Sequence, residues 1–229
     1  MAKRFYKEVG VEARDGAFVV VLDGRVLKTP GKQHLTFDKE FRAALVAQEW
    51  DAQEGDIKPE TMPCTRMMNV ACEQTPDRRP DLVAEFRKYC GTDLLCYRSH
   101  APRDLCEQQE RDWQPILDWA VENHNIALAV TTSIHAVGQA ETSLNAAAAY
   151  AQTLSHTKLT LLVHFTASLG SSILALALLE GRLNLDESLA LSRLDEEFQI
   201  ERWGEDEEAQ ERIQNLHTEL AAMARLITA

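Results

Sequence analysis

The chain has 229 residues, of which 45% are hydrophobic and 26% are charged, a composition typical of a soluble globular protein with one or two domains. Its formal net charge of −12 is uneven: residues 1–76 hold 11 basic and 12 acidic side chains, and residues 77–229 hold 13 and 24. This balance excludes nucleic-acid binding, which requires a basic surface, but suits a basic or apolar protein partner.

The N-terminal part is predicted to form short strands joined by tight turns. Asp15-Gly16 and Asp23-Gly24 separate its apolar runs, and Asp-Gly between such runs is a strong hairpin signal. Strands are predicted over residues 5–13, 18–22 and 34–37. Together they predict a small antiparallel sheet.

Helices follow the predicted sheet. Asp38 can cap a helix over residues 39–53, and a short helix is predicted after Pro63. Pro76 and Pro80 then mark the expected domain boundary, because proline interrupts regular structure.

Beyond these prolines only helices are predicted. The candidates are residues 81–90, 104–123, 141–153, 158–180, 186–202 and 205–226. The expected fold class is therefore α+β. It comprises an N-terminal domain over residues 1–76, with a small antiparallel sheet plus helix, and an all-α helical-bundle C-terminal domain over residues 77–229.

Residues 159–179 form an apolar stretch of 21 residues without a formal charge, which is long enough to span a membrane. However, His164, Gly170 and several hydroxyl side chains make its centre polar, and the neighbouring helices are acidic. A helix that is apolar on all sides also suits the centre of a bundle. We expect one buried central helix and no membrane insertion; a membrane-attached helical protein is the alternative.

Residues 191–209, LSRLDEEFQIERWGEDEEA, form the most acidic part of the chain, with eight acidic side chains in nineteen residues. Gly204 predicts a helix end after Trp203, because glycine tolerates positive φ, and residues 205–208 would open the next helix. We call residues 195–208 the acidic elbow. Two interpretations stay open: a solvated turn with Trp203 in the core, or a docking surface that exposes an aromatic side chain.

The five cysteines are Cys64, Cys72, Cys90, Cys96 and Cys106. They include no C-x-x-C pair and no zinc-ligand spacing with histidine, and their number is odd. The start, MAKRFYKEVGVEARDG, resembles neither a secretory signal nor a long transit peptide. We therefore expect free thiols in a reducing compartment, the cytoplasm of a bacterium, or the mitochondrial matrix for a processed organellar protein.

Several sequence blocks, in order, resemble one known family. They are RFYKEV at 4–9, LDGRVLKTP at 22–30, EWDAQ at 49–53, MPCTRMMN at 62–69, TDLLCYR at 92–98, W-x-P-x-x-x-W-A at 113–120 and LSRLDEEFQIERWG at 191–204. The ordered set resembles the assembly chaperones of ATP synthase that bind the α subunit of F1-ATPase, known in mitochondria as assembly factor 2. The resemblance covers nearly the whole chain and implies the same two-domain fold.

The resemblance also implies a function and a site. The expected protein is an ATP-independent chaperone, not an enzyme, that binds the unassembled F1 α subunit, prevents its aggregation and supports F1 assembly. It implies no cofactor, and we expect a monomer when the protein is free. The residues at family-motif positions, taken as the partner-binding site, are Glu196, Glu197, Gln199, Trp203, Gly204 and Glu207.

Enzymatic alternatives have weaker support in the sequence. The acidic elbow could bind a divalent cation in a metal-dependent hydrolase, but it lacks the spacing of an EF-hand loop. No phosphate-binding G-x-x-x-x-G-K-[ST] and no G-x-S-x-G elbow occur. Two roles stay open for Arg66 and Arg98: contact with the bound partner protein, or an internal ion pair. His164 and Cys96 are expected to be buried rather than catalytic.

Overall fold

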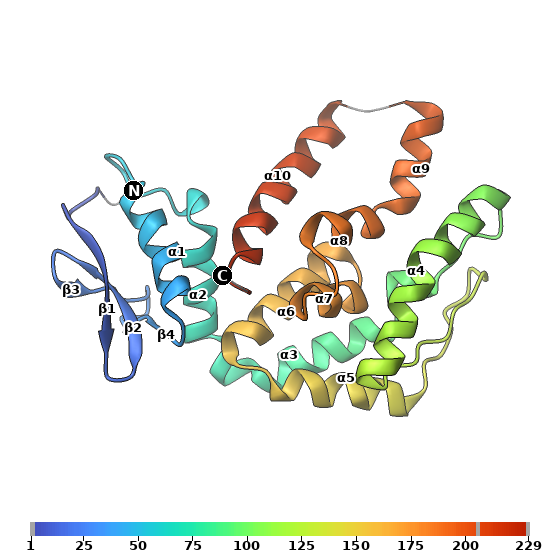
Figure 1. The fold of residues 1–229 in the computed structure, drawn as a ribbon, viewed down its shortest axis with the longest axis horizontal. Helices are drawn as coiled ribbons and strands as arrows, with labels where there is room; N and C mark the ends of the chain where they lie inside the picture. The colour runs from blue at the N-terminus through green and yellow to red at the C-terminus, as the bar shows by residue number, and fades with distance from the viewer. Residues whose placement is uncertain (1–2, 205–206, 228–229) are drawn as a thin grey trace. The chain divides into compact units, whose positions relative to one another are not determined.

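The computed structural model describes residues 3–204 and 207–227, with the side chains of residues 207–209 left out (Figure 1). The chain divides into two compact units, Met1–Arg78 together with Glu219–Ala229, and Arg79–Thr218. The predicted α+β class is confirmed, because a four-stranded antiparallel sheet precedes a mostly helical chain.

The sheet of the first unit is built on two Asp-Gly turns. Asp15-Gly16 joins the first hairpin and has φ of 50° and 79°, as a two-residue hairpin turn requires. Val9 lies opposite Leu22 in this hairpin. The strands are β1 (Val9–Arg14), β2 (Ala17–Leu22), β3 (Arg25–Val26) and β4 (Thr36–Phe37), with β2 pairing to the other three.

Two helices follow the sheet in this unit: α1 (Glu40–Asp51), which packs against β1, β2 and β4, and α2 (Pro63–Glu73), which packs against α1. A single 3₁₀ turn, η1 (Pro59–Thr61), lies between them. Val20 and Val46 are fully buried where sheet and α1 meet. The predicted strands and helices of this region are thus present, with shifts of a few residues at their ends.

The end of the chain also belongs to the first unit. Arg42 is only 3% exposed, and its Nε donates to the Leu226 carbonyl oxygen at 2.8 Å. Arg66 pairs with Glu219 at 2.6 Å. The predicted domains of residues 1–76 and 77–229 did not include this return of the chain. The division after Arg78 falls within α3 (Thr75–Cys90), a helix that runs through both Pro76 and Pro80.

The second unit is helical. Its elements after α3 are η2 (Leu94–Cys96), α4 (Arg103–His124), α5 (Glu141–Thr153), α6 (His156–Leu169), α7 (Ser172–Leu179), α8 (Leu185–Ser192), α9 (Leu194–Trp203) and most of α10 (Glu207–Ala224). The predicted helix over 141–153 has the observed bounds. The predicted helix over 186–202 is wrong, because Arg193 separates α8 from α9.

The single apolar helix predicted over residues 158–180 is also wrong. Gly170 has φ of 66°, a left-handed conformation that glycine adopts without a Cβ clash, and it ends α6 before α7 begins. The expected burial is present, since all eight residues of α7 are buried. In the part of the chain that the structure describes, no helix is long and apolar enough to cross a membrane.

Asp93 fixes the break between α6 and α7. Its buried carboxylate accepts hydrogen bonds from the hydroxyls of Ser171 and Ser172, at 2.8 and 2.5 Å. The backbone N–H groups of Leu95 and Ile173 donate to it at 3.0 and 3.1 Å. Burial raises the pKa of Asp93, and these donors oppose the rise. This buried carboxylate therefore ties η2 to the N-terminus of α7.

Arg98, in the same sequence block as Asp93, is an internal residue. Its Nε donates to the Leu95 carbonyl oxygen and its Nη1 to that of Gln109, both at 2.8 Å. Its guanidinium lies 5.3 Å from the centre of the Trp113 ring, an attractive cation–π distance. Arg98 is thus bonded within the second unit, in line with the internal role left open above.

Candidate partner-binding site

The first half of α9 is attached to the core of the second unit. Leu194 and Phe198 are buried, one helical turn apart on the same face, and α9 packs against α4. Gln109 on α4 donates through Nε2 to the Asp195 carboxylate at 2.6 Å. Asp195 therefore helps to hold α9 against α4.

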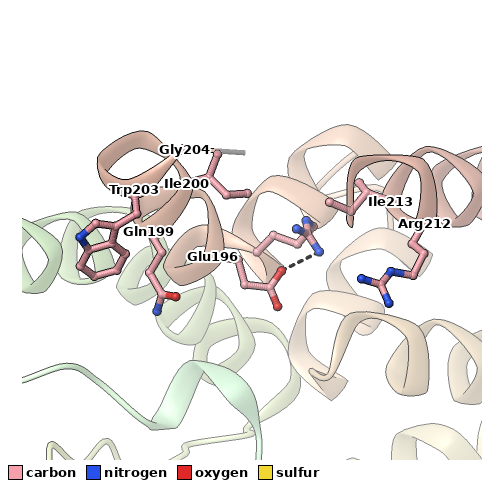
Figure 2. A pocket seen from close by; sticks show the side chains of 8 residues that line it. Glu196, Gln199, Ile200, Trp203, Gly204, Arg212 and Ile213 are labelled. Carbon is pink, nitrogen blue, oxygen red and sulfur yellow. Dashed lines mark ion pairs between the residues drawn. The ribbon is translucent and has the colours of Figure 1, made fainter. Parts of the chain in front are cut away.

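The opposite face of α9 is open and shares a hollow with α10. Figure 2 shows Glu196, Gln199, Ile200 and Trp203 projecting from α9, with Arg212 and Ile213 on the neighbouring helix α10. The hollow has a volume of about 490 Å³. Its lining residues are Arg193, Glu196, Gln199, Ile200, Trp203, Gly204, Arg212 and Ile213. Four of the six residues predicted as the partner-binding site thus line one hollow.

Trp203 is 78% exposed, so the interpretation that places it in the core is wrong. Phe198 fills the buried aromatic position instead, with the Arg202 guanidinium 4.1 Å from its ring centre. Arg202 also forms an ion pair with Asp104 of α4. The last turn of α9 is therefore pinned by its neighbours while the Trp203 indole points into solvent.

Gly204 ends α9, as the sequence predicts. Its N–H donates to the Ile200 carbonyl oxygen at 2.9 Å, and its φ of 92° with ψ of 168° lies in a region that is nearly restricted to glycine. This backbone reversal leaves Trp203 as the final residue of the helix.

The carboxylates of Glu196 and Glu197 are exposed but share a cation. Arg193 pairs with Glu196 at 2.6 Å and approaches Glu197 at 3.6 Å. The Arg193 Nε is buried and has no hydrogen-bond acceptor among the described residues. Arg193 is a member of the site that sequence reasoning missed. A basic residue three and four positions before two glutamates was the available signal.

A second hollow, of about 570 Å³, is also lined by residues of both α9 and α10. Glu197, Glu211 and Gln214 contribute polar side chains to it, while Ile200 and Ile213 line both hollows. The site therefore has an aliphatic centre, with Glu196, Arg193 and Arg212 around the first hollow and two carboxylates around the second. The apolar centre and the carboxylates of the second hollow suit a partner that carries apolar and basic residues together.

The remaining predicted residue, Glu207, opens α10, but its side chain lies outside those that the structure describes, and residues 205–206 lie outside the described residues altogether. Among the described residues, no three His, Cys, Asp or Glu side chains lie close enough to hold a metal ion. Burial raises the pKa of the Cys90 and Cys96 thiols to about 12, which keeps them protonated and unreactive.

Comparison with known proteins identifies the family. The ATP12 chaperone protein family model matches residues 3–121. The chain belongs to the ATP12 chaperone family. The crystal structure of Atp12 from Paracoccus denitrificans has 38% identity and a TM-score of 0.93, covering 99% of this chain and 97% of that one. The Atu1473 protein of Agrobacterium tumefaciens has 35% identity and a TM-score of 0.92, with 98% and 85% covered.

Curated ATP12 relatives agree with this assignment. The mitochondrial ATP12 proteins of Schizosaccharomyces pombe and Saccharomyces cerevisiae are 25% and 26% identical to the chain. The matches cover 91% and 90% of this chain and 76% and 78% of the relatives. The predicted family is confirmed, and the protein is an ATP12-type assembly chaperone of ATP synthase. The acidic elbow lies beyond the residues that the family model matches, so its assignment as the partner-binding site stays a prediction.

Proposed function

We propose that this ATP12 protein binds the unassembled α subunit of F1-ATPase, prevents its aggregation and supports assembly of the F1 sector. The single observation that carries the proposal is the exposed Trp203 at the end of α9, beside a hollow that Ile200 and Ile213 line together with charged side chains. An unassembled subunit exposes apolar surface that later contacts its neighbours, and such surface aggregates unless it is covered.

The chemistry of the site fits a partner that must be held and later released. Trp203 and Ile200 offer apolar contact area, as aromatic anchors do at protein interfaces. Glu196 and Glu197 remain exposed despite their pairing with Arg193, so they can attract and orient basic residues of the α subunit. Binding of this kind uses no nucleotide hydrolysis, and we propose that the protein acts as a non-enzymatic chaperone without a cofactor. Its place of action would be the bacterial cytoplasm or the mitochondrial matrix.

The direct test mixes purified protein with F1 α subunit diluted from denaturant and follows aggregation by light scattering. We expect suppression at about equimolar ratio, with and without ATP and Mg²⁺, together with a co-eluting complex in gel filtration. F1 β subunit, presented in the same way, is the control client and should aggregate unchanged. Equal protection of both subunits, or protection only with ATP, would contradict the proposal.

A further inference from the structure

A second hollow with a different character lies in the first unit, within residues 3–78. Its volume is about 670 Å³, within the usual range for binding pockets. It lies among the N-terminal segment, the β2–β3 hairpin and the end of α1. Its floor is apolar, formed by Tyr6, Leu22, Leu27 and Trp50, and Phe5 forms its edge. We call it the N-terminal groove.

The exposed Phe5 is held in place by its neighbours along the chain. The Arg4 Nη1 donates to the Asp51 carbonyl oxygen at 2.6 Å, at the C-terminal end of α1. The Tyr6 hydroxyl donates to the Trp50 carbonyl oxygen at 2.7 Å. The Phe5 ring packs edge-on against the Tyr6 ring, yet the residue remains 71% exposed. A large apolar side chain fixed in an exposed position is preorganised for contact with a partner.

The rim of the N-terminal groove is basic, in contrast to the chain as a whole. Arg25 and Lys28 are exposed there, and neither forms an ion pair with a described residue. The one carboxylate at the rim, Asp23, accepts the backbone N–H groups of Lys7 and Glu8 at 3.0 and 2.8 Å. These two bonds lower the pKa of Asp23, and the nearby positive charges of Lys7 and Arg25 lower it further. The rim thus carries two cations, Arg25 and Lys28, against one carboxylate, and the groove offers net positive charge beside apolar surface.

We propose that the N-terminal groove binds an acidic, apolar peptide segment of a partner polypeptide. Its apolar side chains would cover Phe5 and Trp50, and its carboxylates would approach Arg25 and Lys28. Complementary charge favours this occupant over a basic segment. The groove and the acidic elbow have opposite charge and belong to different units, so the inference does not depend on the α-subunit site proposed above.

The test uses a synthetic peptide in which leucine alternates with aspartate, with two control peptides that carry lysine for aspartate or serine for leucine. Binding to the full chain is followed by the indole N–H signals in a ¹H–¹⁵N spectrum. We expect the acidic peptide to shift the Trp50 signal saturably and to leave Trp203 unchanged. Failure of the acidic peptide to shift Trp50 at about 1 mM, or an equal shift with the lysine peptide, would overturn the proposal.

Charge-reversed variants locate the contact. The double variant Arg25→Glu, Lys28→Glu should lower the affinity for the acidic peptide roughly tenfold or more. Phe5→Ser should lower this affinity by a similar factor, because apolar contact is lost. Lys58→Glu, an exposed lysine of the same unit that does not line the groove, should bind as wild type. If Lys58→Glu lowered the affinity for the acidic peptide equally, net charge alone would explain the effect, and the proposed site would be wrong. Concentration-dependent dimers abolished by Arg25→Glu would identify a second copy as the occupant and overturn the choice of partner.

Discussion

Trp203 combines high exposure with a fixed position, so its contribution to binding can be separated from its contribution to folding. We expect Trp203→Ala to change the free energy of unfolding by about 0.5 kcal/mol or less, because the residue is 78% exposed. Affinity for the α subunit should fall tenfold or more, about 1.4 kcal/mol or above. Urea unfolding and a binding titration measure the two effects. A large loss of stability with unchanged affinity for the α subunit would show that Trp203 has a structural role and not a binding role.

The carboxylates of α9 allow a matched test of local contact against net charge. Glu196→Lys should weaken α-subunit binding roughly tenfold, because it places a cation where the partner is proposed to be basic. Glu201→Lys is the control, since Glu201 is exposed on the same helix but lines neither hollow. Loss of the Arg193 pair should cost about 0.5 kcal/mol of stability. If both variants weaken binding equally, α9 acts only through overall charge.

Removal of the buried Asp93 carboxylate should destabilise the fold strongly. Asp93→Ala leaves two hydroxyls and two backbone N–H groups without their buried acceptor. Each unsatisfied group costs about 1–3 kcal/mol, so we expect at least about 3 kcal/mol of destabilisation in urea. Glu122→Ala, which removes an exposed carboxylate from α4, should be neutral. Equal unfolding midpoints for the two variants would show that the Asp93 network is dispensable.

At the scale of the elements, the end of α9 depends on one backbone conformation. Gly204→Ala places a Cβ at φ of 92°, at a cost of about 1–3 kcal/mol, although nothing lies within 4 Å of the new atom. The last turn of α9 should therefore fray, seen as faster hydrogen exchange at the residue 204 N–H and weaker α-subunit binding. Gly138→Ala is the control, because that site is equally open and has no positive φ. Unchanged exchange would show that the chain reverses without glycine.

Element types were easier to predict than element breaks. Periodic apolar patterns and Asp-Gly turns identified the sheet and most helices, because both signals are local. The break at Gly170 was missed, since an uncharged stretch carries no periodicity to interrupt. What stabilises that break is Asp93, which lies 78 residues before Ser171 in the chain. No local pattern can report such a contact.

The candidate site was predicted only in part, because some of its residues are close in sequence and others come from a different helix. Glu196, Gln199, Trp203 and Gly204 are close in sequence, so a helical pattern and a family motif place them together. Ile213 and Arg212 come from α10, and only the pairing of two helices brings them to the hollow. The exposure of Trp203 could not be read from spacing, because Phe198 and Trp203 both could have filled the buried position. Packing against α4 selects Phe198.

At the scale of the whole molecule, the last residues of the chain complete the first unit. Leu220, Met223 and Leu226 are at most 2% exposed. Burial of one such side chain contributes about 1.5–3 kcal/mol, so a truncation before residue 219 should remove most of the stability of a domain of ordinary size. We expect residues 3–78 to lose hydrogen-exchange protection in the truncated protein. Leu226→Ala, as the milder comparison, should cost about 2–5 kcal/mol. Full protection after truncation would show that the first unit folds without its C-terminal piece.

The two-part composition of the first unit has a consequence for synthesis. Residues 79–218 are an insertion between its two pieces, so a ribosome makes the sheet, then the entire helical unit, and only then the segment from Glu219 onward. Until that segment emerges, the Arg42 guanidinium lacks the Leu226 carbonyl oxygen that it binds in the finished fold. Because chains fold progressively from the N-terminus as they emerge, the helical unit can fold first although it is translated second. A chain released from the ribosome before residue 219 would therefore carry the helical unit together with a first unit that lacks its C-terminal piece.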